Sequence, residues 1–133
     1  MKNVATIGRI LFALPFGILG LNHFLMTDTF LGMMSSFLPR GGYTILLTGA
    51  FLIAASICIL LNKFIKVVCF SLAGILFLFI VTIHLPHLFS ASTDVVFQEG
   101  LFGLLKDTGL MGGALIIAAY YRPDEVIYPE KQS

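Results

Sequence analysis

The segment 101–122, LFGLLKDTGLMGGALIIAAYYR, constrains the fold more than any other part of the chain. It is apolar on both sides of the adjacent residues Lys106 and Asp107. A helix needs about 20 apolar residues to cross about 30 Å of hydrocarbon, and this segment reaches that length only if it includes the two charges. A charge near the bilayer centre costs about 2.5–3.5 kcal/mol on insertion scales, so such residues generally face protein or water and have partners. We therefore expect other parts of the chain to compensate them.

The two charges are not expected to neutralise each other. Neighbouring residues on a helix point about 100° apart, so Lys106 and Asp107 should each find a partner elsewhere. The alternative is that Lys106 extends toward the lipid head groups while Asp107 caps a helix that begins there.

The composition is that of an integral membrane protein. Hydrophobic residues make up 58% of the chain and charged residues 11%, with a mean hydropathy of +0.98, whereas soluble domains carry about 25% charged residues. We expect one domain over residues 1–123 and a cytoplasmic tail over 124–133. The net charge of +1 and the lack of a basic patch argue against a nucleic-acid partner. The expected partners are the lipid bilayer and either another membrane protein or a second copy of the chain.

Four apolar runs predict four spans, over residues 4–25, 43–61, 64–85 and 101–122. Pro86 is expected to disturb the third helix, and the polar residues 90–100 are expected to form an exposed loop. In residues 27–38 apolar side chains recur at near-helical spacing between polar ones, which predicts a short amphipathic helix lying in the interface. An apolar loop over the mouth of the bundle is the alternative. The predicted fold is all-α, an integral membrane four-helix bundle with an interfacial helix in the first outer loop.

The basic residues predict an orientation. Four spans place both termini on one side of the membrane, and by the positive-inside rule that side is the cytoplasm. The residues on that side are Lys2, Arg9, Lys63, Lys66, Arg122 and Lys131, against Arg40 and Lys106 on the other.

This topology gathers polar residues at the outer ends of the helices. The first and third spans finish there and the fourth begins there, so their polar side chains should lie at similar depth. They would line a small-molecule pocket covered by residues 27–38. The candidate ligand-binding residues are Asn22, His23, His84, His87, Lys106 and Asp107, which include all three histidines of the chain.

Three interpretations of this set compete. His23, His84 and His87 with Asp107 could form a metal site of three imidazoles and one carboxylate, although Pro86 disfavours the helical geometry it needs. A quinone fits better, because imidazole, amide and ammonium groups would hold its oxygens while Phe24, Phe30 and Phe37 cover its ring. Histidine can also exchange a proton near neutral pH. The plainest interpretation is that the imidazoles are interfacial anchors.

Small residues on the fourth span suggest a packing surface. Gly109, Gly112 and Gly113 form a strip suited to close helix contact, within the bundle or with a second copy. On the first span, Gly17 and Gly20 offer similar close-packing points. Cys58 and Cys69 are not spaced as a C-x-x-C pair, which argues against a thiol relay.

At these residues the chain resembles the DoxX family of small four-span membrane proteins. The similarity lies in Gly8-Arg9-Ile10, in the run from Gly17 through Gly20 to His23-Phe24, and above all in Lys106-Asp107 followed by Gly112-Gly113. The resemblance covers residues 7–121. It implies a four-helix bundle in the bacterial cytoplasmic membrane and a link to quinone-linked oxidoreductase systems.

Two functions follow as expectations. The first is a subunit or accessory factor of a membrane-associated redox system, with a quinone or lipid-like molecule bound near the outer face. The second is a non-catalytic scaffold or assembly factor that holds a partner membrane protein through its glycine face. A small transporter is disfavoured because the two halves lack matching broken helices.

Overall fold

The structure is a computed structural model that describes residues 2–33 and 41–121. The described residues form helices and turns, with no strand among them, so the predicted all-α class is confirmed. In chain order the elements are α1 (Lys2–Leu25), α2 (Thr27–Met33), α3 (Gly42–Leu60), α4 (Ile65–Phe79), the π-helix η1 (Ile80–His84), α5 (Leu85–Phe89) and α6 (Asp94–Tyr120).

Four helices are long and apolar enough to cross a membrane, as predicted, and the chain is a multi-pass membrane protein. The spans are Asn3–Leu25, Gly42–Leu60, Ile65–Phe89 and Asp94–Tyr120. Two predicted boundaries are wrong. The third helical run continues through Phe89, and residues 94–100 are the first turns of α6 rather than a loop. The reason for the early start is the cap, because the Thr93 hydroxyl accepts a hydrogen bond from the backbone N–H of Val96 at 3.3 Å.

The first outer loop contains the short helix α2. It covers the first part of the predicted 27–38 helix and rules out an irregular loop over Thr27–Met33. Residues 34–38 lie outside the described residues, as do Arg40, Arg122 and the predicted 124–133 tail.

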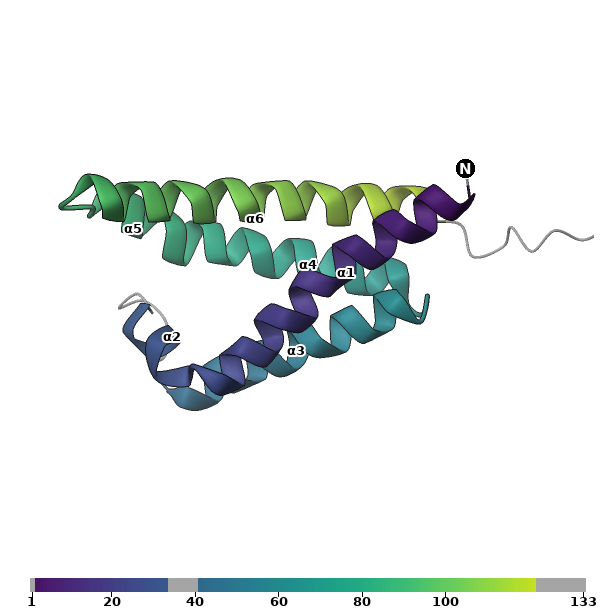
Figure 1. Cartoon of the computed structure of the whole chain (residues 1–133), viewed down its shortest axis with the longest axis horizontal. Coiled ribbons are helices and arrows are strands. Elements are labelled where there is room, and N and C mark those ends of the chain that lie inside the picture. Colours follow the sequence, from purple (N-terminus) through teal and green to yellow (C-terminus); the bar gives the residue numbers. More distant parts are fainter. Residues whose placement is uncertain (1, 34–40, 122–133) are drawn as a thin grey trace, which may run out of the picture.

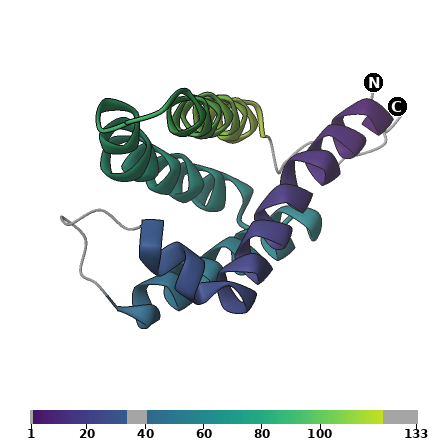
Figure 2. The same ribbon diagram turned by 60° about the vertical axis from the view of Figure 1, so that its left-hand side comes forward.

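The four long helices pack as two pairs, α1 with α3 and α4 with α6. Figures 1 and 2 show the pairs as two layers that approach one another toward the N-terminal end of α1 and diverge toward α2 and α5. The main apolar core lies in the half where the pairs approach, and it includes Ala13, Phe16, Ile59, Leu72 and Ala118.

Small residues bring α1 and α3 into close contact, so the predicted role of Gly17 and Gly20 is confirmed. A Cβ at Gly20 would lie 2.7 Å from the carbonyl oxygen of Gly49, and one at Gly17 would lie 2.9 Å from the Ser56 hydroxyl. The Ser56 hydroxyl also donates a hydrogen bond to the carbonyl oxygen of Ala13 at 2.9 Å. Close backbone approach and interhelical hydrogen bonds are the usual means of helix association in lipid.

The third helical run passes Pro86 without ending. Proline lacks an N–H and its ring clashes with the carbonyl four residues earlier in an α-helix. Here the preceding turn is the π-helix η1, in which the backbone N–H of Leu85 bonds to the carbonyl of Ile80 five residues back. The wider turn lets the chain remain helical through Phe89. The helix is thus disturbed next to Pro86 as expected, but the predicted end of the third span at residue 85 is wrong.

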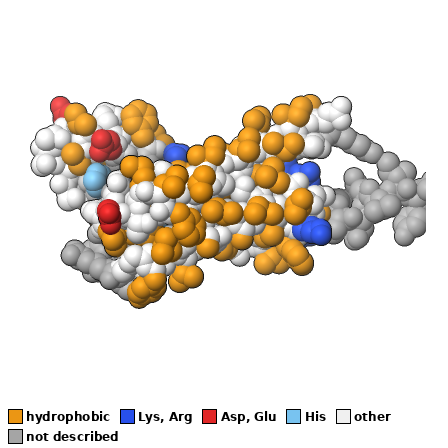
Figure 3. Space-filling model, turned by 60° about the horizontal axis from the view of Figure 1, so that its bottom comes forward, with side chains coloured by type: hydrophobic (Ala, Val, Ile, Leu, Met, Phe, Trp, Pro, Cys, Tyr) orange, Lys and Arg blue, Asp and Glu red, His pale blue; other side chains and the backbone are white. Residues whose placement is uncertain are grey.

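Charged residues are divided between the two ends of the molecule. Figure 3 shows acidic and histidine side chains gathered at one end of the visible face, most lysine and arginine side chains at the other, and apolar side chains between them. The basic end includes the turn between α3 and α4, where Lys63 lies beside two residues of positive φ, Asn62 and Phe64.

Candidate functional site

A cavity of about 260 Å³ lies between the two helix pairs, in the half where they diverge. Its walls are mainly apolar and come from α1, α2, α3, α4, η1 and α6, with Phe16 and Leu52 among the lining residues. Phe30 of α2 lines the cavity, so α2 covers it as predicted. Of the other two aromatic residues expected around a ligand, Phe24 does not line the cavity, and Phe37 lies outside the described residues.

The polar wall of the cavity is built around Asp107. This residue is in the middle of α6, 13 positions after Asp94, which is about 20 Å along the helix. Only 3% of its surface is exposed. The alternative in which a helix begins at Asp107 is therefore wrong, since α6 begins at Asp94 and is capped by Thr93.

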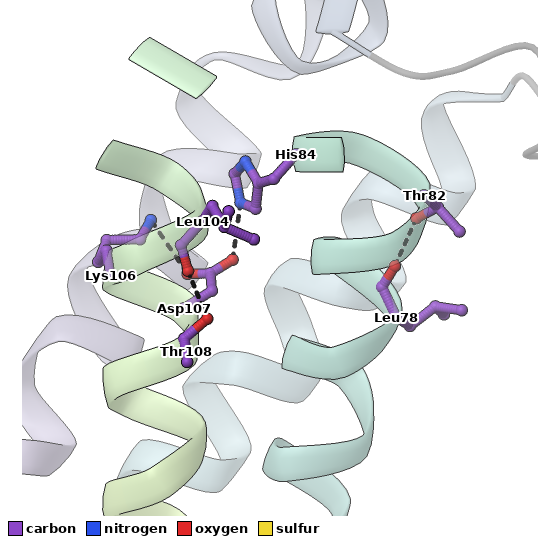
Figure 4. A network of polar contacts seen from close by, with 7 residues as sticks. All are labelled: Leu78, Thr82, His84, Leu104, Lys106, Asp107 and Thr108. Atoms are coloured by element: carbon purple, nitrogen blue, oxygen red, sulfur yellow. Dashed lines mark hydrogen bonds and ion pairs between the residues drawn. The ribbon is translucent and has the colours of Figure 1, made fainter. Parts of the chain in front are cut away.

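Asp107 is compensated by two side chains. The Nε2–H of His84 donates to its Oδ2 at 2.8 Å, and the Nζ of Lys106 lies 3.4 Å from its Oδ1. Figure 4 shows the imidazole reaching from the π-helix to α6 and the lysine folding back over its own helix. The prediction of a partner from another helix is confirmed for Asp107. The prediction that the neighbours would not pair is wrong, because the flexible four-carbon stem of lysine spans the angle between them.

Gly103, one turn before Asp107, makes room for the imidazole. A Cβ built on Gly103 would overlap the Cε1 and Nδ1 atoms of His84 and lie 3.2 Å from Nε2. The ring is therefore seated against bare helix backbone, and a larger side chain at position 103 would displace it from this place. We did not predict this residue, because a glycine in an apolar run shows its role only once the opposite residue is known.

His23 forms another part of the cavity wall. It is buried in α1, and its Nδ1–H donates to the carbonyl oxygen of Leu19 at 2.7 Å. Its ring stacks on Phe30 with 4.0 Å between centroids. The bonded Nδ1 must carry the proton because a carbonyl only accepts, so in the neutral ring Nε2 is an acceptor. His23 thus lines the same cavity as His84 and Asp107, from the opposite helix pair.

Two of the candidate residues are not part of the cavity. His87 lines a separate small cleft beside α6, and Asn22 lines neither of these spaces. Both lie only one to three residues from a lining histidine, but their position around the helix differs. The predicted six-residue set is thus reduced to His23, His84, Lys106 and Asp107 in the main cavity.

The alternative metal site is not assembled. Across residues 2–33 and 41–121, no group of three or more histidine, cysteine or acidic side chains is placed to hold a metal ion. His84 and Asp107 meet directly, while His23 bonds to its own helix and His87 is in the neighbouring cleft.

Threonine hydroxyls add polarity that we did not predict. Thr44, Thr48 and Thr82 all line the cavity. Thr48 donates to the carbonyl of Thr44 at 2.9 Å and Thr82 to that of Leu78 at 2.7 Å. Each hydroxyl that donates in this way keeps lone pairs that can accept from a ligand. The threonines gave no separate signal in the sequence because they occur singly within apolar runs.

Among the described residues, Gly113 is the one of the three predicted packing glycines at which a Cβ would meet another helix. A Cβ there would lie 3.0 Å from the Phe12 ring of α1, whereas no atom lies within 4 Å of a Cβ at Gly109 or Gly112. The last two therefore face away from the rest of the described chain.

No family model, curated protein or solved structure matches the chain. The DoxX resemblance has no support from these comparisons, and the function has to be argued from the cavity itself.

Proposed function

We propose that the chain binds a quinone-like molecule in the cavity between its helix pairs, as a DoxX-like subunit or accessory factor of a membrane redox system. The observation that supports this most is the pairing of a mainly apolar cavity with one hydrogen-bonding wall. Ligand pockets usually combine apolar walls with a few placed polar groups. Ionisable residues inside a membrane span are expensive and are usually functional.

The dimensions and chemistry suit a ring-sized head group. The cavity volume of about 260 Å³ lies just below the usual range of about 300–1,000 Å³ for small-molecule pockets. A quinone ring has an oxygen at each end. In our proposal the Lys106 ammonium, half exposed, donates to one oxygen. In the reduced, quinol form the hydroxyl at the other end donates to an acceptor across the cavity, either Nε2 of His23 or the oxygen of Thr48. A long apolar tail would extend into the lipid.

The test uses decylubiquinone and the purified protein in lipid nanodiscs. We expect saturable binding that Asp107→Asn or His84→Ala weakens by at least about tenfold, the value of one charged hydrogen bond. Asp94→Asn is the matched control. Asp94 is also an acidic residue of α6, but it is exposed and does not line the cavity. Thr48→Phe should abolish binding by filling the cavity without removing a charge. Undiminished binding in all of these variants would refute the proposal.

The proposed location is the bacterial cytoplasmic membrane, with the N- and C-termini in the cytoplasm. The N-terminal end of α1 and the α3–α4 turn lie at the same end of the molecule (Figure 1), and that end carries Lys63 and Lys66. Basic residues favour the cytoplasmic side. With both native cysteines replaced, an impermeant maleimide applied to intact cells should label Asp94→Cys and spare Lys63→Cys; the reverse pattern would invert the orientation.

A non-catalytic scaffold is the second candidate, and the open glycines on α6 favour it. A Cβ at Gly109 or Gly112 would meet no atom of the described chain within 4 Å, and open glycines of this kind suit close helix contact. Gly112→Leu should then abolish a cross-link to a partner membrane protein in native membranes. A cross-link that survives this substitution would exclude the glycine face as the contact.

A further inference from the structure

We propose that a proton route leads from the outer surface through His84 to the Asp107 carboxylate. This inference rests on the proposed function, because it supplies the buried carboxylate with the protons that a quinone-like ligand exchanges. Its basis is a second cleft of about 60 Å³ that shares His84 with the main cavity. The other lining residues of this cleft are Ile83, His87, Glu99 and Gly100. One imidazole therefore lies between two spaces.

The cleft has the size to hold water, and polar side chains are among its lining residues. One water molecule occupies about 30 Å³ in the liquid and needs two or more polar partners in a protein. Glu99 is exposed on the first turns of α6, and His87 lies against the same helix, with its Cδ2 3.4 Å from a Cβ built on Gly100. Glu99 and His87 thus provide an acceptor and a titratable imidazole at the surface side of His84.

His84 is oriented to pass a proton on. Its Nε2–H donates to Oδ2 of Asp107 at 2.8 Å, and Figure 4 shows the other ring nitrogen, Nδ1, directed away from the carboxylate. In the proposed step a hydronium ion that reaches the cleft from outside gives a proton to Nδ1 and remains as water, so that one O–H bond breaks and one N–H bond forms. The Nε2–H bond then breaks and its proton forms an O–H bond on Asp107. The ring ends neutral, the carboxyl ends neutral, and no electron is transferred.

Several charged or titratable groups surround this pair. The Nζ of Lys106 lies 3.4 Å from Oδ1 of Asp107, on the same helix. His23 of α1 lies on the other helix pair and is bonded to its own backbone. His87 of α5 and Glu99 of α6 face His84 from the cleft side. A ligand oxygen that accepts the proton from Asp107 would return the site to its starting charge.

Time-resolved infrared spectroscopy of the full chain in nanodiscs after a rapid drop in pH tests the route. The carbonyl band of protonated Asp107 is assigned as the one that Asp107→Asn removes. We expect His84→Gln to slow the appearance of this band by at least about a hundredfold, the lower end of what a positioned proton-transfer group contributes. The amide can still donate to Asp107 but cannot relay a proton. Glu99→Gln should slow it less, and the control Asp94→Asn should leave the rate unchanged.

The equilibrium fraction of protonated Asp107, measured in the same samples, separates a slower route from a changed proton affinity. A wild-type rate in His84→Gln would overturn the proposal, as would the absence of an Asp107 band at any pH at which the protein is folded. Decylubiquinone binding is measured in parallel. If decylubiquinone binds but His84→Gln protonates Asp107 at the wild-type rate, only the proton route is refuted. If decylubiquinone does not bind but His84→Gln slows the protonation of Asp107, only the proposed function is refuted.

Discussion

Replacing Gly103 by alanine should break the contact on which the polar wall depends. The new methyl group would overlap two atoms of the His84 ring. Because the ring is the end of a side chain, it can rotate away, but it then gives up its 2.8 Å hydrogen bond to Asp107. The buried carboxylate would be left with Lys106 alone.

The magnitude follows from two opposing terms. A hydrogen bond to a charged group contributes about 1.5–3 kcal/mol, whereas alanine is favoured over glycine within a helix by about 0.5–1 kcal/mol. Gly103→Ala should therefore lower the free energy of unfolding by about 0.5–2.5 kcal/mol, the difference of the two terms. The matched control is Gly109→Ala on the same helix, where a Cβ meets no atom within 4 Å. It should raise the free energy of unfolding by about 0.5–1 kcal/mol.

The assay is denaturant unfolding in detergent micelles, combined with nitrogen-15 NMR of the His84 ring. The Nε2–H signal should lose its hydrogen-bonded shift in Gly103→Ala and keep it in Gly109→Ala. In a His84→Ala background the collision is gone, so Gly103→Ala should become neutral or stabilising. Equal stability of Gly103→Ala and Gly109→Ala in the wild-type background would refute this account of the glycine.

Two further substitutions test other parts of the fold by the same unfolding measurement. Gly20→Val should destabilise the α1–α3 pair by about 1–3 kcal/mol, the usual cost of overpacking, because a Cβ at position 20 meets the backbone of Gly49. Gly8→Ala is the control, because a Cβ at position 8 meets open space. Equal stability of the two variants would contradict the close packing of α1 and α3. Phe64→Gly should stabilise the chain by about 1 kcal/mol, because a φ of 54° is costly for a bulky residue. Replacing the exposed Phe70 inside α4 by glycine is the control and should destabilise the chain by about 1 kcal/mol. If both substitutions change the free energy of unfolding in the same direction, backbone strain at Phe64 is excluded.

Much of the architecture could be predicted because hydrocarbon imposes a length on each apolar run. The topology of four spans then brought the end of the third span beside the start of the fourth, which is why the meeting of His84 and Asp107 could be anticipated. The start of α6 could also have been found, since threonine followed by an acidic residue at 93–94 is a helix-start signal. Residues 90–100 were instead predicted to form a loop because they are polar.

The details of the site could not be predicted, because they depend on rotation about a helix axis. His84 and His87 are only three residues apart, yet they lie in different spaces, since the π-helix and Pro86 alter the phase of the helix there. The role of Gly103 depends on which residue of the neighbouring helix is opposite, and no local pattern encodes this. The contact of Lys106 with Asp107 depends on the side-chain conformation of the lysine.

The π-helix also shows how this site could arise or be lost in a single genetic event. A π turn holds one residue more than the α turn it replaces, and one residue corresponds to about 100° of rotation. Deleting one of the codons for residues 80–83 would leave the span apolar, but it would turn the imidazole of His84 away from the carboxylate of Asp107. One residue more or less in a transmembrane helix is therefore enough to bring a histidine into or out of register with a carboxylate on the neighbouring helix.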